Sequence, residues 1–495
     1  MKANNKNLLF ITADQWRGDC LSAVDHPVVK TPHLDALARD GTLYLKHFSQ
    51  AAPCGPSRAS MHTGTYLMTN RSVNNGVPLD DRFTNWAKEL RGAGHDPVLF
   101  GYTDISLDPR GRPLDDPALF TYQGVLPGLK LGMATDDEGV NWGRWLQGKG
   151  IEVPTPPRLL YRDKKPQTEW EHGGPSAAPM KLASEHHDTR FITQQAMDYI
   201  DAAESNWCVH LSLLRPHPPW VAPEPYNAMY DPGQLPANIG AKSITEESAQ
   251  HPWLAYQLQQ RVHMRPNNEK LMRRLSASYY GLMSEVDDNI GRLIALLKQS
   301  GEYDSTLIIF TSDHGEQLGD HWLLGKVGYF DQSFHVPLIV RDPLKEAGKT
   351  VNTFTENIDL MPTLLEWFGV DVPAQCDGLS LNAGVREECH WEFDFRNVND
   401  SQAESALGIT LHQCNLCVLR DDNFKYVHFA ALPALLFDLR KDPHELVNCA
   451  TDPAYSQRVT EYSQKMLSWR MRHADQTLTH LALGEDGVSQ RQAPR

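Results

Sequence analysis

The chain has 495 residues, a formal net charge of -15, 41% hydrophobic residues and 22% charged residues. This composition is ordinary for a globular protein, and a chain of this length is expected to form more than one domain. The negative charge argues against an extended nucleic-acid surface, so an anionic substrate has to be attracted by local positive charge. No apolar run is long enough to span a bilayer, so the sequence predicts neither a nucleic-acid partner nor a membrane partner.

The N-terminal apolar run covers residues 8–13 and is followed at once by Asp14. It is too short for the core of a signal peptide, so it predicts a buried strand and a cytoplasmic protein. Eight cysteines in a chain of this length do not make a disulfide scaffold. Cys414 and Cys417 form a C-x-x-C pair without a partner pair, which favours two reduced cysteines in a strand over a zinc or redox site.

Strand-like and helix-like segments then alternate along the chain. Residues 8–12 and 97–101 predict buried strands, and residues 32–40 predict a helix that Gly41 caps. The clearest unit covers residues 284–312, where apolar residues recur at helical spacing up to Gly301. A buried strand over residues 306–311 follows directly. This alternation is typical of an α/β fold, in which functional side chains follow the carboxyl ends of strands.

Two proline-rich stretches, residues 153–180 and 215–240, predict long loops of the kind that form lids or substrate walls. Residues 359–369 predict a capped helix. After about Gly378 the pattern becomes shorter and more strand-like. We therefore expect an α/β domain over residues 1–379 and a smaller α+β domain over residues 380–495.

The first group of reactive side chains lies in the run Cys-Gly-Pro-Ser-Arg at residues 54–58. A cysteine before Gly-Pro is expected on a turn or at a helix start, not inside a regular helix. Arg58 then lies where it can hold an anion. The residues alone leave two interpretations open: Cys54 is a thiolate nucleophile, or the segment is a structural turn with a surface arginine.

The second group lies at the ends of two predicted strands. Asp14 and Gln15 follow the first strand, and Asp313 and His314 follow the strand at residues 306–311. Parallel strands that end in oxygen and nitrogen donors can converge on one hard cation. The alternative is that Asp14 and Asp313 are helix N-caps, which is common after a strand.

These motifs resemble the sulfatase signature C-x-P-S-R followed by T-G, here residues 54–58 and 63–64. The resemblance extends from Asn7 to about Ala450, with further matching segments at residues 32–38, 312–316, 335–338, 359–364, 437–439 and 442–445. It implies the alkaline-phosphatase-like α/β fold: a large mixed sheet sandwiched by helices and a smaller C-terminal domain that contains an antiparallel sheet. Residues 1–379 would then be the catalytic, sulfatase-like domain.

Two departures from the common sulfatase pattern point to one branch of the family. Gln15 stands where most members have a second acid, and no lysine follows Gly101 and Tyr102 before Arg110. Together with residues 71–76, Arg-Ser-Val-Asn-Asn-Gly, these features resemble the phosphonate monoester hydrolase and phosphodiesterase branch. Asp104 stands where that branch has a neutral polar residue, so its role stays open.

The resemblance implies roles for individual residues that the sequence alone would not single out. It implies formylglycine at position 54, made by oxidation of Cys54, and one divalent metal ion (Mn, Ca, Mg or Zn) held by that group together with Asp14, Gln15, Asp313 and His314. Arg58 and Asn75 would steady the nucleophile and a substrate oxygen. His217 and Lys326 would face the leaving group, and Tyr102 and Thr103 would line the pocket.

The resemblance thus predicts hydrolysis of phosphonate monoesters and phosphodiesters by a formylglycine nucleophile, with promiscuity toward sulfate esters. The alternatives are an arylsulfatase or alkyl sulfatase, and a non-catalytic metal-binding protein on the same fold. The non-catalytic alternative predicts losses at the nucleophile or the metal ligands, and all of these residues are present. The expected partners are a small anionic ester, a formylglycine-generating enzyme for maturation, and further copies of the chain in a homo-oligomer such as a tetramer.

Overall fold

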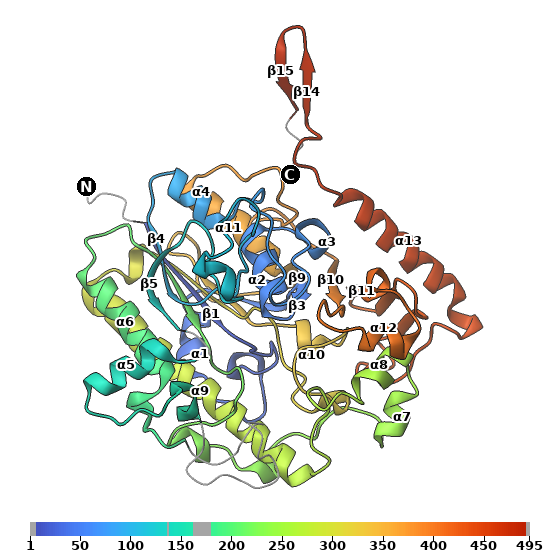
Figure 1. Ribbon diagram of the computed structural model, residues 1–495, viewed down its shortest axis with the longest axis horizontal. Coiled ribbons are helices and arrows are strands. Elements are labelled where there is room, and N and C mark those ends of the chain that lie inside the picture. The colour runs from blue at the N-terminus through green and yellow to red at the C-terminus, as the bar shows by residue number, and fades with distance from the viewer. Residues whose placement is uncertain (1–5, 136–137, 162–179, 492–495) are drawn as a thin grey trace.

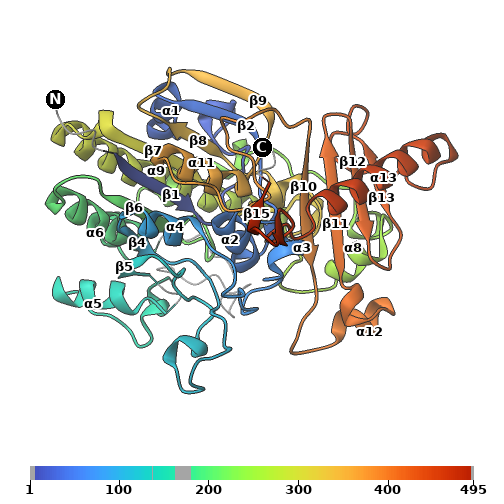
Figure 2. The same ribbon diagram turned by 90° about the horizontal axis from the view of Figure 1, so that it is seen from above.

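The structure is a computed structural model that describes residues 6–135, 138–161 and 180–491. It is an α/β fold with a mixed sheet of eight strands, a second sheet of five strands, and a two-stranded hairpin near the C-terminus (Figures 1 and 2). This is the predicted fold class, a large mixed sheet between helices followed by a smaller antiparallel sheet. Among the described residues, no helix is both long and apolar enough to cross a membrane.

The large sheet has the strand order β5-β4-β6-β1-β7-β8-β2-β9. Its strands are β1 (Asn7–Ala13), β2 (Thr42–Phe48), β4 (Pro97–Gly101), β5 (Lys130–Ala134), β6 (Cys208–Leu213), β7 (Thr306–Thr311), β8 (Leu338–Arg341) and β9 (Lys349–Glu356). Strand β8 is antiparallel to both of its neighbours, and the other pairs are parallel. The central strands β6, β1 and β7 are buried along their whole length, as expected where helices cover both faces of a sheet.

Helices cover both faces of this sheet (Figure 1). One face packs on α1 (Pro32–Arg39), α5 (Val140–Gly148), α6 (Asp188–Ala202) and α9 (Glu269–Ser300), and the other on α2 (Cys54–Thr63), α4 (Trp86–Gly92) and α11 (Leu360–Phe368). Successive side chains of β1 point to opposite faces of the sheet, so that Leu9 and Ile11 pack in the first core while Leu8 and Phe10 pack in the second. The sheet therefore fixes where its strand ends emerge.

The second sheet has the order β13-β12-β11-β10-β3. Its strands are β3 (Ala51–Ala52), β10 (Glu388–Asp394), β11 (Asn415–Asp421), β12 (Phe424–Phe429) and β13 (Leu435–Asp438). Strand β3 pairs with β10, so this sheet takes one strand from the N-terminal part of the chain. That strand comes just before α2 and fixes the path of the chain into Cys54. The division at residues 379 and 380 stays a prediction.

The remaining α-helices and strands are short, apart from the helix on the second sheet. They are α3 (Leu67–Asn70), α7 (Ile244–Ser248), α8 (Pro252–Gln257), α10 (Asp331–Phe334), α12 (Gln402–Leu407), α13 (Ser456–Arg472), β14 (Leu481–Gly484) and β15 (Gly487–Gln490). Helix α13 packs on one face of the second sheet through Tyr462, Met466 and Trp469. The hairpin of β14 and β15 projects away from the body (Figure 1).

The predicted strands agree with β1, β4 and β7, and the predicted helix end at Gly301 has the left-handed φ of 75°. Helix α9 begins well before residue 284, at an N-cap from Asn268. The prediction that Gly41 caps α1 is wrong, because α1 ends at Arg39 and its C-cap is Asp40, which has a right-handed conformation. Gly41 is needed for another reason: a Cβ there would lie 2.5 Å from the Val340 carbonyl oxygen.

Within the described residues, the predicted loops contain only short 3-10 turns, among them Pro157–Tyr161, and no α-helix or strand. Part of the stretch at 153–180, residues 162–179, lies outside the described residues, and residues 215–240 contain two 3-10 turns, Tyr226–Ala228 and Pro232–Gln234. Cys417 lies in β11 and Cys414 immediately precedes it, and all eight cysteines are free.

Candidate active site

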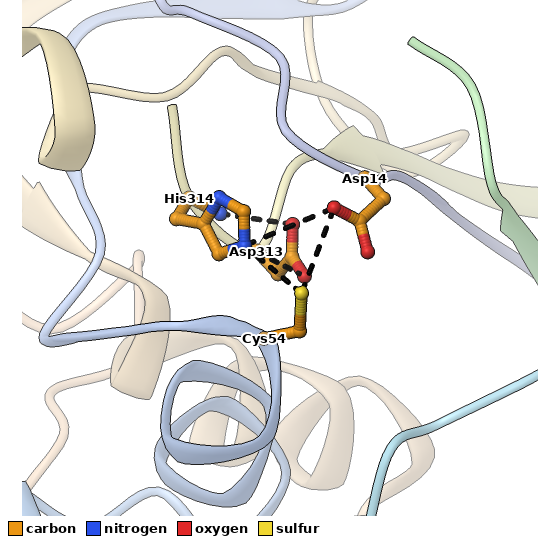
Figure 3. Close-up of side chains that lie close together, drawn as sticks. All are labelled: Asp14, Cys54, Asp313 and His314. Carbon is orange, nitrogen blue, oxygen red and sulfur yellow. Dashed lines mark hydrogen bonds and ion pairs between the residues drawn. The ribbon is translucent and has the colours of Figure 1, made fainter. Parts of the chain in front are cut away.

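Two neighbouring strand ends bring acidic side chains together. Strands β1 and β7 are parallel and pair Thr12 with Thr311, so Asp14 and Asp313 emerge at the same edge of the sheet. Figure 3 shows the side chains of Asp14, Asp313 and His314 directed toward Cys54. The ligand atoms of these four buried residues all lie within 4.8 Å of one another. The sequence prediction that the two strand ends converge is thus met.

Neither acid is a helix cap. The first helical turn after β1 is Ser22–Val24, which begins after Leu21, and the first after β7 is Asp320–Trp322, which begins after Gly319. Asp313 instead accepts hydrogen bonds at Oδ1 from the backbone N–H groups of Gln15 and His314, at 3.1 and 3.0 Å. These bonds hold the carboxylate in place and leave the capping interpretation without support.

Cys54 is the first residue of α2, as the Gly-Pro sequence after it predicts. Proline is tolerated in the first helical turn because the N–H groups there have no partner within the helix. The Cys54 sulfur lies 3.2 Å from Nε2 of His314 and 3.8 Å from Oδ1 of Asp14. Burial and the nearby charge of Asp14 raise the pKa of the Cys54 thiol, so the protein's own groups do not make a thiolate here.

Arg58 is fully buried and lies one helical turn after Cys54, so it is not a surface arginine. Its Nε donates to Asp313 at 3.0 Å, and its Nη2 donates to Asp14 at 3.1 Å. Its Nη1 donates to Ser212 Oγ at 2.8 Å and to the Tyr102 carbonyl at 3.1 Å. Burial lowers the pKa of the guanidinium, but Asp313 and its other acidic neighbours raise it well above its ordinary value. Arg58 thus joins the ends of four strands as a permanent cation.

Gln15 and Lys326 lie together at the mouth of this centre. Gln15 has a left-handed φ of 69°, and its Oε1 accepts a hydrogen bond from Lys326 Nζ at 2.6 Å. Its Nε2 donates to Glu316, a fully buried carboxylate that sequence reasoning did not single out. Burial lowers the pKa of Lys326, but Cys54, Asp14 and Asp313 raise it above its ordinary value, so Lys326 stays charged.

Glu316 orients both residues at this mouth. Its Oε1 accepts from the backbone N–H groups of Leu318 at 2.8 Å and of Gly325 at 2.6 Å, next to Lys326. The same carboxylate accepts from Gln15. The only signal in the sequence is its place two residues after His314, inside the segment that resembles the family.

Tyr102 belongs to the centre, whereas Thr103 is turned away from it. The Tyr102 hydroxyl donates to Asp14 Oδ2 at 2.5 Å, and its ring lies 4.4 Å from the Arg58 guanidinium. The Thr103 hydroxyl donates to the Gly124 carbonyl and accepts from the Leu126 N–H, both at 2.8 Å. Thr103 thus braces a neighbouring loop. Asp104 is buried beside this group with a left-handed φ of 49° and contributes negative charge near Cys54.

Asn75 and His217 approach from two loops. Oδ1 of Asn75 accepts from the Gly55 N–H at 2.8 Å and so braces the residue after Cys54. His217 is half-buried and lines a cleft of about 520 Å³ together with Gln15 and Lys326. Burial raises the pKa of Asp14, but His217, Lys326 and Arg58 together lower it well below its ordinary value, so Asp14 is ionised.

Arg215 holds the His217 loop in place, and sequence reasoning missed it. It is 1% exposed, its Nη1 donates to the His217 carbonyl at 2.7 Å, and its Nε pairs with Asp188 at 3.3 Å. Its guanidinium lies over the Tyr161 ring at 4.4 Å. No local pattern marks this residue, because its partners come from α6 and from the turn Pro157–Tyr161.

The donors at the centre fit a divalent cation. His314 Nδ1 lies 3.0 Å from the Gly315 carbonyl, which can only accept, so Nδ1 carries the proton and Nε2 keeps its lone pair for the centre. Two carboxylates and this imidazole make the mixed oxygen and nitrogen set that such ions accept, and Gln15, whose amide oxygen accepts from Lys326, lies beside them. An oxygen in place of the Cys54 sulfur would complete it.

Comparison with known proteins agrees with this geometry. A family model described as Sulfatase matches residues 6–370, and one described as N-sulphoglucosamine sulphohydrolase, C-terminal, matches residues 319–472. The chain is 42% identical over 517 aligned residues to the multifunctional alkaline phosphatase superfamily protein PehA of Trinickia caryophylli, with 98% of this chain and 99% of that protein covered. It is 26% identical to an arylsulfatase of Clostridium perfringens, with 93% of each chain covered.

Solved structures of phosphonate monoester hydrolases match this chain over nearly its whole length. The crystal structure of phosphonate monoester hydrolase of Agrobacterium radiobacter matches with a TM-score of 0.94 at 42% identity, and covers 99% of this chain and 100% of its own. Phosphonate monoester hydrolase SpPMH from Silicibacter pomeroyi matches with a TM-score of 0.91 at 38% identity, and covers 98% of this chain and 99% of its own.

Proposed function

This chain belongs to the sulfatase family of the alkaline phosphatase superfamily, and from that premise we propose that it hydrolyses phosphonate monoesters and phosphodiesters with a formylglycine nucleophile made from Cys54. It is a hydrolase that acts on ester bonds, and its near relatives include phosphonate monoester hydrolases. The observation that carries the proposal is the buried group of Asp14, Asp313 and His314 around Cys54.

The proposed metal ligands are Asp14, Gln15, Asp313, His314 and the oxygen of formylglycine at position 54. When bound, a divalent ion of this kind polarises the ester and lowers the pKa of the attacking hydroxyl. Manganese, calcium, magnesium and zinc all suit this ligand set. Hydrated formylglycine would supply one hydroxyl for attack and a second whose deprotonation expels the product, so that no water has to attack.

The other residues have separate tasks in this proposal. Arg58 stays charged beside the reacting group and, with Lys326, balances the negative charge that builds up in the transition state. His217 and Lys326 line the cleft and would protonate or stabilise the departing alcohol. Asn75, which accepts from the Gly55 N–H, would hold the nucleophile in line with the ester.

Tyr102 and Thr103 have unequal support as pocket residues. The Tyr102 hydroxyl donates to Asp14 at 2.5 Å, so Tyr102 would orient this carboxylate and form part of the pocket. The contacts of Thr103 go to the Gly124 and Leu126 backbone, which supports a bracing role for this side chain.

The first test is Cys54→Ala with Cys449→Ala as its control, because Cys449 is a half-buried free cysteine away from the centre. We expect Cys54→Ala to abolish turnover of a phenylphosphonate monoester while metal content, measured by elemental analysis, stays close to wild type. The wild-type peptide containing Cys54 should show the mass loss of thiol-to-aldehyde conversion. Near-normal turnover by Cys54→Ala, or by protein with an intact thiol, would refute the nucleophile assignment.

A second candidate is an arylsulfatase or alkyl sulfatase, which the arylsulfatase of Clostridium perfringens among the relatives favours. A sulfate monoester has the same single charge and the same tetrahedral shape as a phosphonate monoester, so we expect promiscuity between the two. The test is the ratio of kcat/KM for a phosphonate and a sulfate ester of the same phenol. A ratio in favour of sulfate would replace the first proposal. A non-catalytic role would require both substrates to remain intact with modified, metal-loaded protein.

We also propose self-association, with a tetramer as the expected form. The hairpin of β14 and β15 projects from the body and leaves Leu483 85% exposed and Val488 69% exposed (Figure 1). An isolated two-stranded hairpin is marginally stable in water, so a second copy that covers these side chains would stabilise it. Sedimentation velocity measures the assembly, and a monomer at micromolar concentration would contradict the proposal.

A cytoplasmic location and maturation by a formylglycine-generating enzyme complete the proposal. All eight cysteines are free, which is typical of a reducing compartment. Expression with and without such an enzyme, followed by mass analysis of the Cys54 peptide, tests the maturation step. Equal conversion of Cys54 in both samples would show that no added enzyme is needed.

A further inference from the structure

The cleft that begins at the Cys54 centre continues away from it between two segments of the chain. Its inner residues, Gln15, His217 and Lys326, belong to the centre itself. Most of its outer residues come from α8 and the loop after it, and from the segment that runs from the end of β10 into the start of α12. Any substituent carried by the reacting ester therefore has a continuous path into this space, which has a volume of about 520 Å³.

One side of the cleft is an aromatic wall with a rigid backing. Phe393 and Phe395 both line the cleft and are stacked, with ring centroids 6.5 Å apart and planes 23° apart. Trp253, which is fully buried, meets them edge-on at centroid distances of 6.0 and 6.2 Å. Because Trp253 fills the space behind both rings, the half-buried Phe395 is held in place at the cleft.

Tyr256 adds a further aromatic ring to the same space. It lies on α8 three residues after Trp253, and at that helical spacing both side chains are on one side of the helix. Trp253 is buried behind the wall, whereas Tyr256 is half-buried and lines the cleft. Val262, 78% exposed, and Val327 extend the apolar lining. The cleft thus offers aromatic and aliphatic surface to a substituent that leaves the centre.

The acids of the cleft are engaged with protein groups. Asp394 pairs with Arg396 at 2.7 Å and with Arg71 at 3.6 Å. Asp400 accepts from Asn397 Nδ2 at 2.6 Å and from the Gln402 N–H. Because Arg396 neutralises Asp394, this pair does not offer a net charge to a second ionic group on the substrate. The acids of the outer cleft are thus engaged with protein groups, and the ring surfaces of Phe395 and Tyr256 are what this wall offers to a substituent.

We propose that this cleft is a subsite for a flat aromatic substituent of the ester, bound against Phe395 and Tyr256. The inference rests on the proposed function only in that the ester reacts at the Cys54 centre. Aromatic rings pack on one another by stacking or edge contacts that are stronger than equal apolar area provides. Phe395 and Tyr256 are therefore the residues that determine specificity for aryl over alkyl esters.

The test compares two esters that react equally well but differ in shape: a phenyl ester, and a fluorinated alkyl ester whose alcohol is as acidic as the phenol. For Phe395→Leu and Tyr256→Leu we expect kcat/KM for the phenyl ester to fall roughly 3- to 10-fold, since each ring contact contributes a modest amount. The alkyl ester should change less than 2-fold, because leucine keeps the apolar volume. Phe120→Leu is the matched control, because the Phe120 side chain is 76% exposed and does not line the cleft. It should change kcat/KM for neither ester.

Binding of phenol and cyclohexanol, measured by saturation-transfer NMR on metal-loaded protein, gives a readout without turnover. Phenol should bind wild type more tightly than cyclohexanol, and Phe395→Leu should reduce this difference while Phe120→Leu keeps it. The subsite would be overturned if Phe395→Leu lowered kcat/KM equally for aryl and alkyl esters. It would also be overturned if this variant kept the wild-type preference for phenol over cyclohexanol. If sulfates are cleaved and phosphonates are not, with the aryl preference intact, the proposed function fails and the subsite stands. If phosphonates are cleaved but the aryl preference is unchanged in Phe395→Leu, the subsite fails and the proposed function stands.

Discussion

The centre around Cys54 and the cleft that leads to it are built in opposite ways. The centre is made of strand ends and one helix start, and its charges are buried and paired: Arg58 is fully buried between Asp14 and Asp313. The cleft wall is made of α8, the end of β10 and the loops that follow them, and the side chains that face a substrate are half-buried rings such as Tyr256 and Phe395. The first region is rigid because the sheet positions it, and the second because Trp253 supports it from behind.

This difference indicates that the centre carries out the reaction and that the cleft wall selects among substrates. Buried, paired charges hold the reacting group in one geometry and tolerate little change, because removing one partner leaves another charge buried. Apolar rings act by area and shape, so one substitution there alters a preference by a modest factor. Substitutions in the centre should therefore affect all esters alike, whereas substitutions in the wall should affect them according to shape.

The largest effect is expected for Arg58→Gln. The change leaves Asp14 and Asp313 without their shared cation, so we expect kcat to fall about 100- to 1000-fold for every ester. The free energy of unfolding should also fall by about 3–5 kcal/mol. Steady-state kinetics and urea denaturation of the same preparations measure both quantities.

Arg386→Gln is the matched control for this prediction. Arg386 also joins two buried carboxylates, Glu356 at 3.1 Å and Asp359, but it lies away from the centre. The Arg386→Gln variant should show a similar fall in the free energy of unfolding. Its kcat, corrected for the folded fraction, should stay at the wild-type value. If both variants lose activity in proportion to stability, Arg58 has only a structural role.

The sequence predicts which side chains meet at the candidate centre, because the signals that mark them are local. A buried strand that ends in polar residues identifies Asp14 and Asp313, and the pairing of two parallel strands brings them together without further information. The Gly-Pro sequence after Cys54 likewise predicts a helix start. The periodicity predicts an α/β fold and a smaller, strand-rich C-terminal part, whereas the mixed sheet and the antiparallel sheet are implied by the resemblance.

The sequence does not predict the contacts that depend on distant segments. Arg215 looks like any loop residue until α6 supplies Asp188, and Glu316 becomes a brace only when Gln15 adopts a left-handed φ. Gly41 follows a helix and suggests a cap, yet it is required by the approach of β8. Phe395 joins Trp253 only after the chain has crossed from α8 to the end of β10. These are packing relations, which no local pattern encodes.

An intermediate effect is expected at the boundary of the two regions, for Arg215→Gln. Arg215 holds the His217 carbonyl, so its loss should displace His217 and lower kcat about 10-fold for esters with poor leaving alcohols, but less for good ones. In a His217→Ala background the same change should have little further effect. The dependence of kcat on leaving-group acidity, measured for all four proteins, tests this coupling.

The control for Arg215 is Arg341→Gln. Arg341 is also a largely buried arginine that donates to the backbone carbonyls of Tyr303 and Thr306 and lies over an aromatic ring at 4.1 Å. The Arg341→Gln variant should show a comparable fall in the free energy of unfolding, but its kcat should depend on leaving-group acidity as in the wild type. Purely additive losses in the double variant with His217→Ala would mean that Arg215 does not act through His217.

The smallest effect on catalysis is expected for Thr103→Val, which tests where the centre ends. Valine keeps the shape of threonine but leaves the Leu126 N–H and the Gly124 carbonyl without their shared partner. The free energy of unfolding should fall by about 1–3 kcal/mol, while kcat and KM for aryl and alkyl esters stay within 2-fold of wild type. Tyr102→Phe, which removes the adjacent hydroxyl from Asp14, should instead lower kcat with less loss of stability, because the phenyl ring still packs on Arg58. A change in KM for Thr103→Val that differs between aryl and alkyl esters would place Thr103 in the substrate pocket after all.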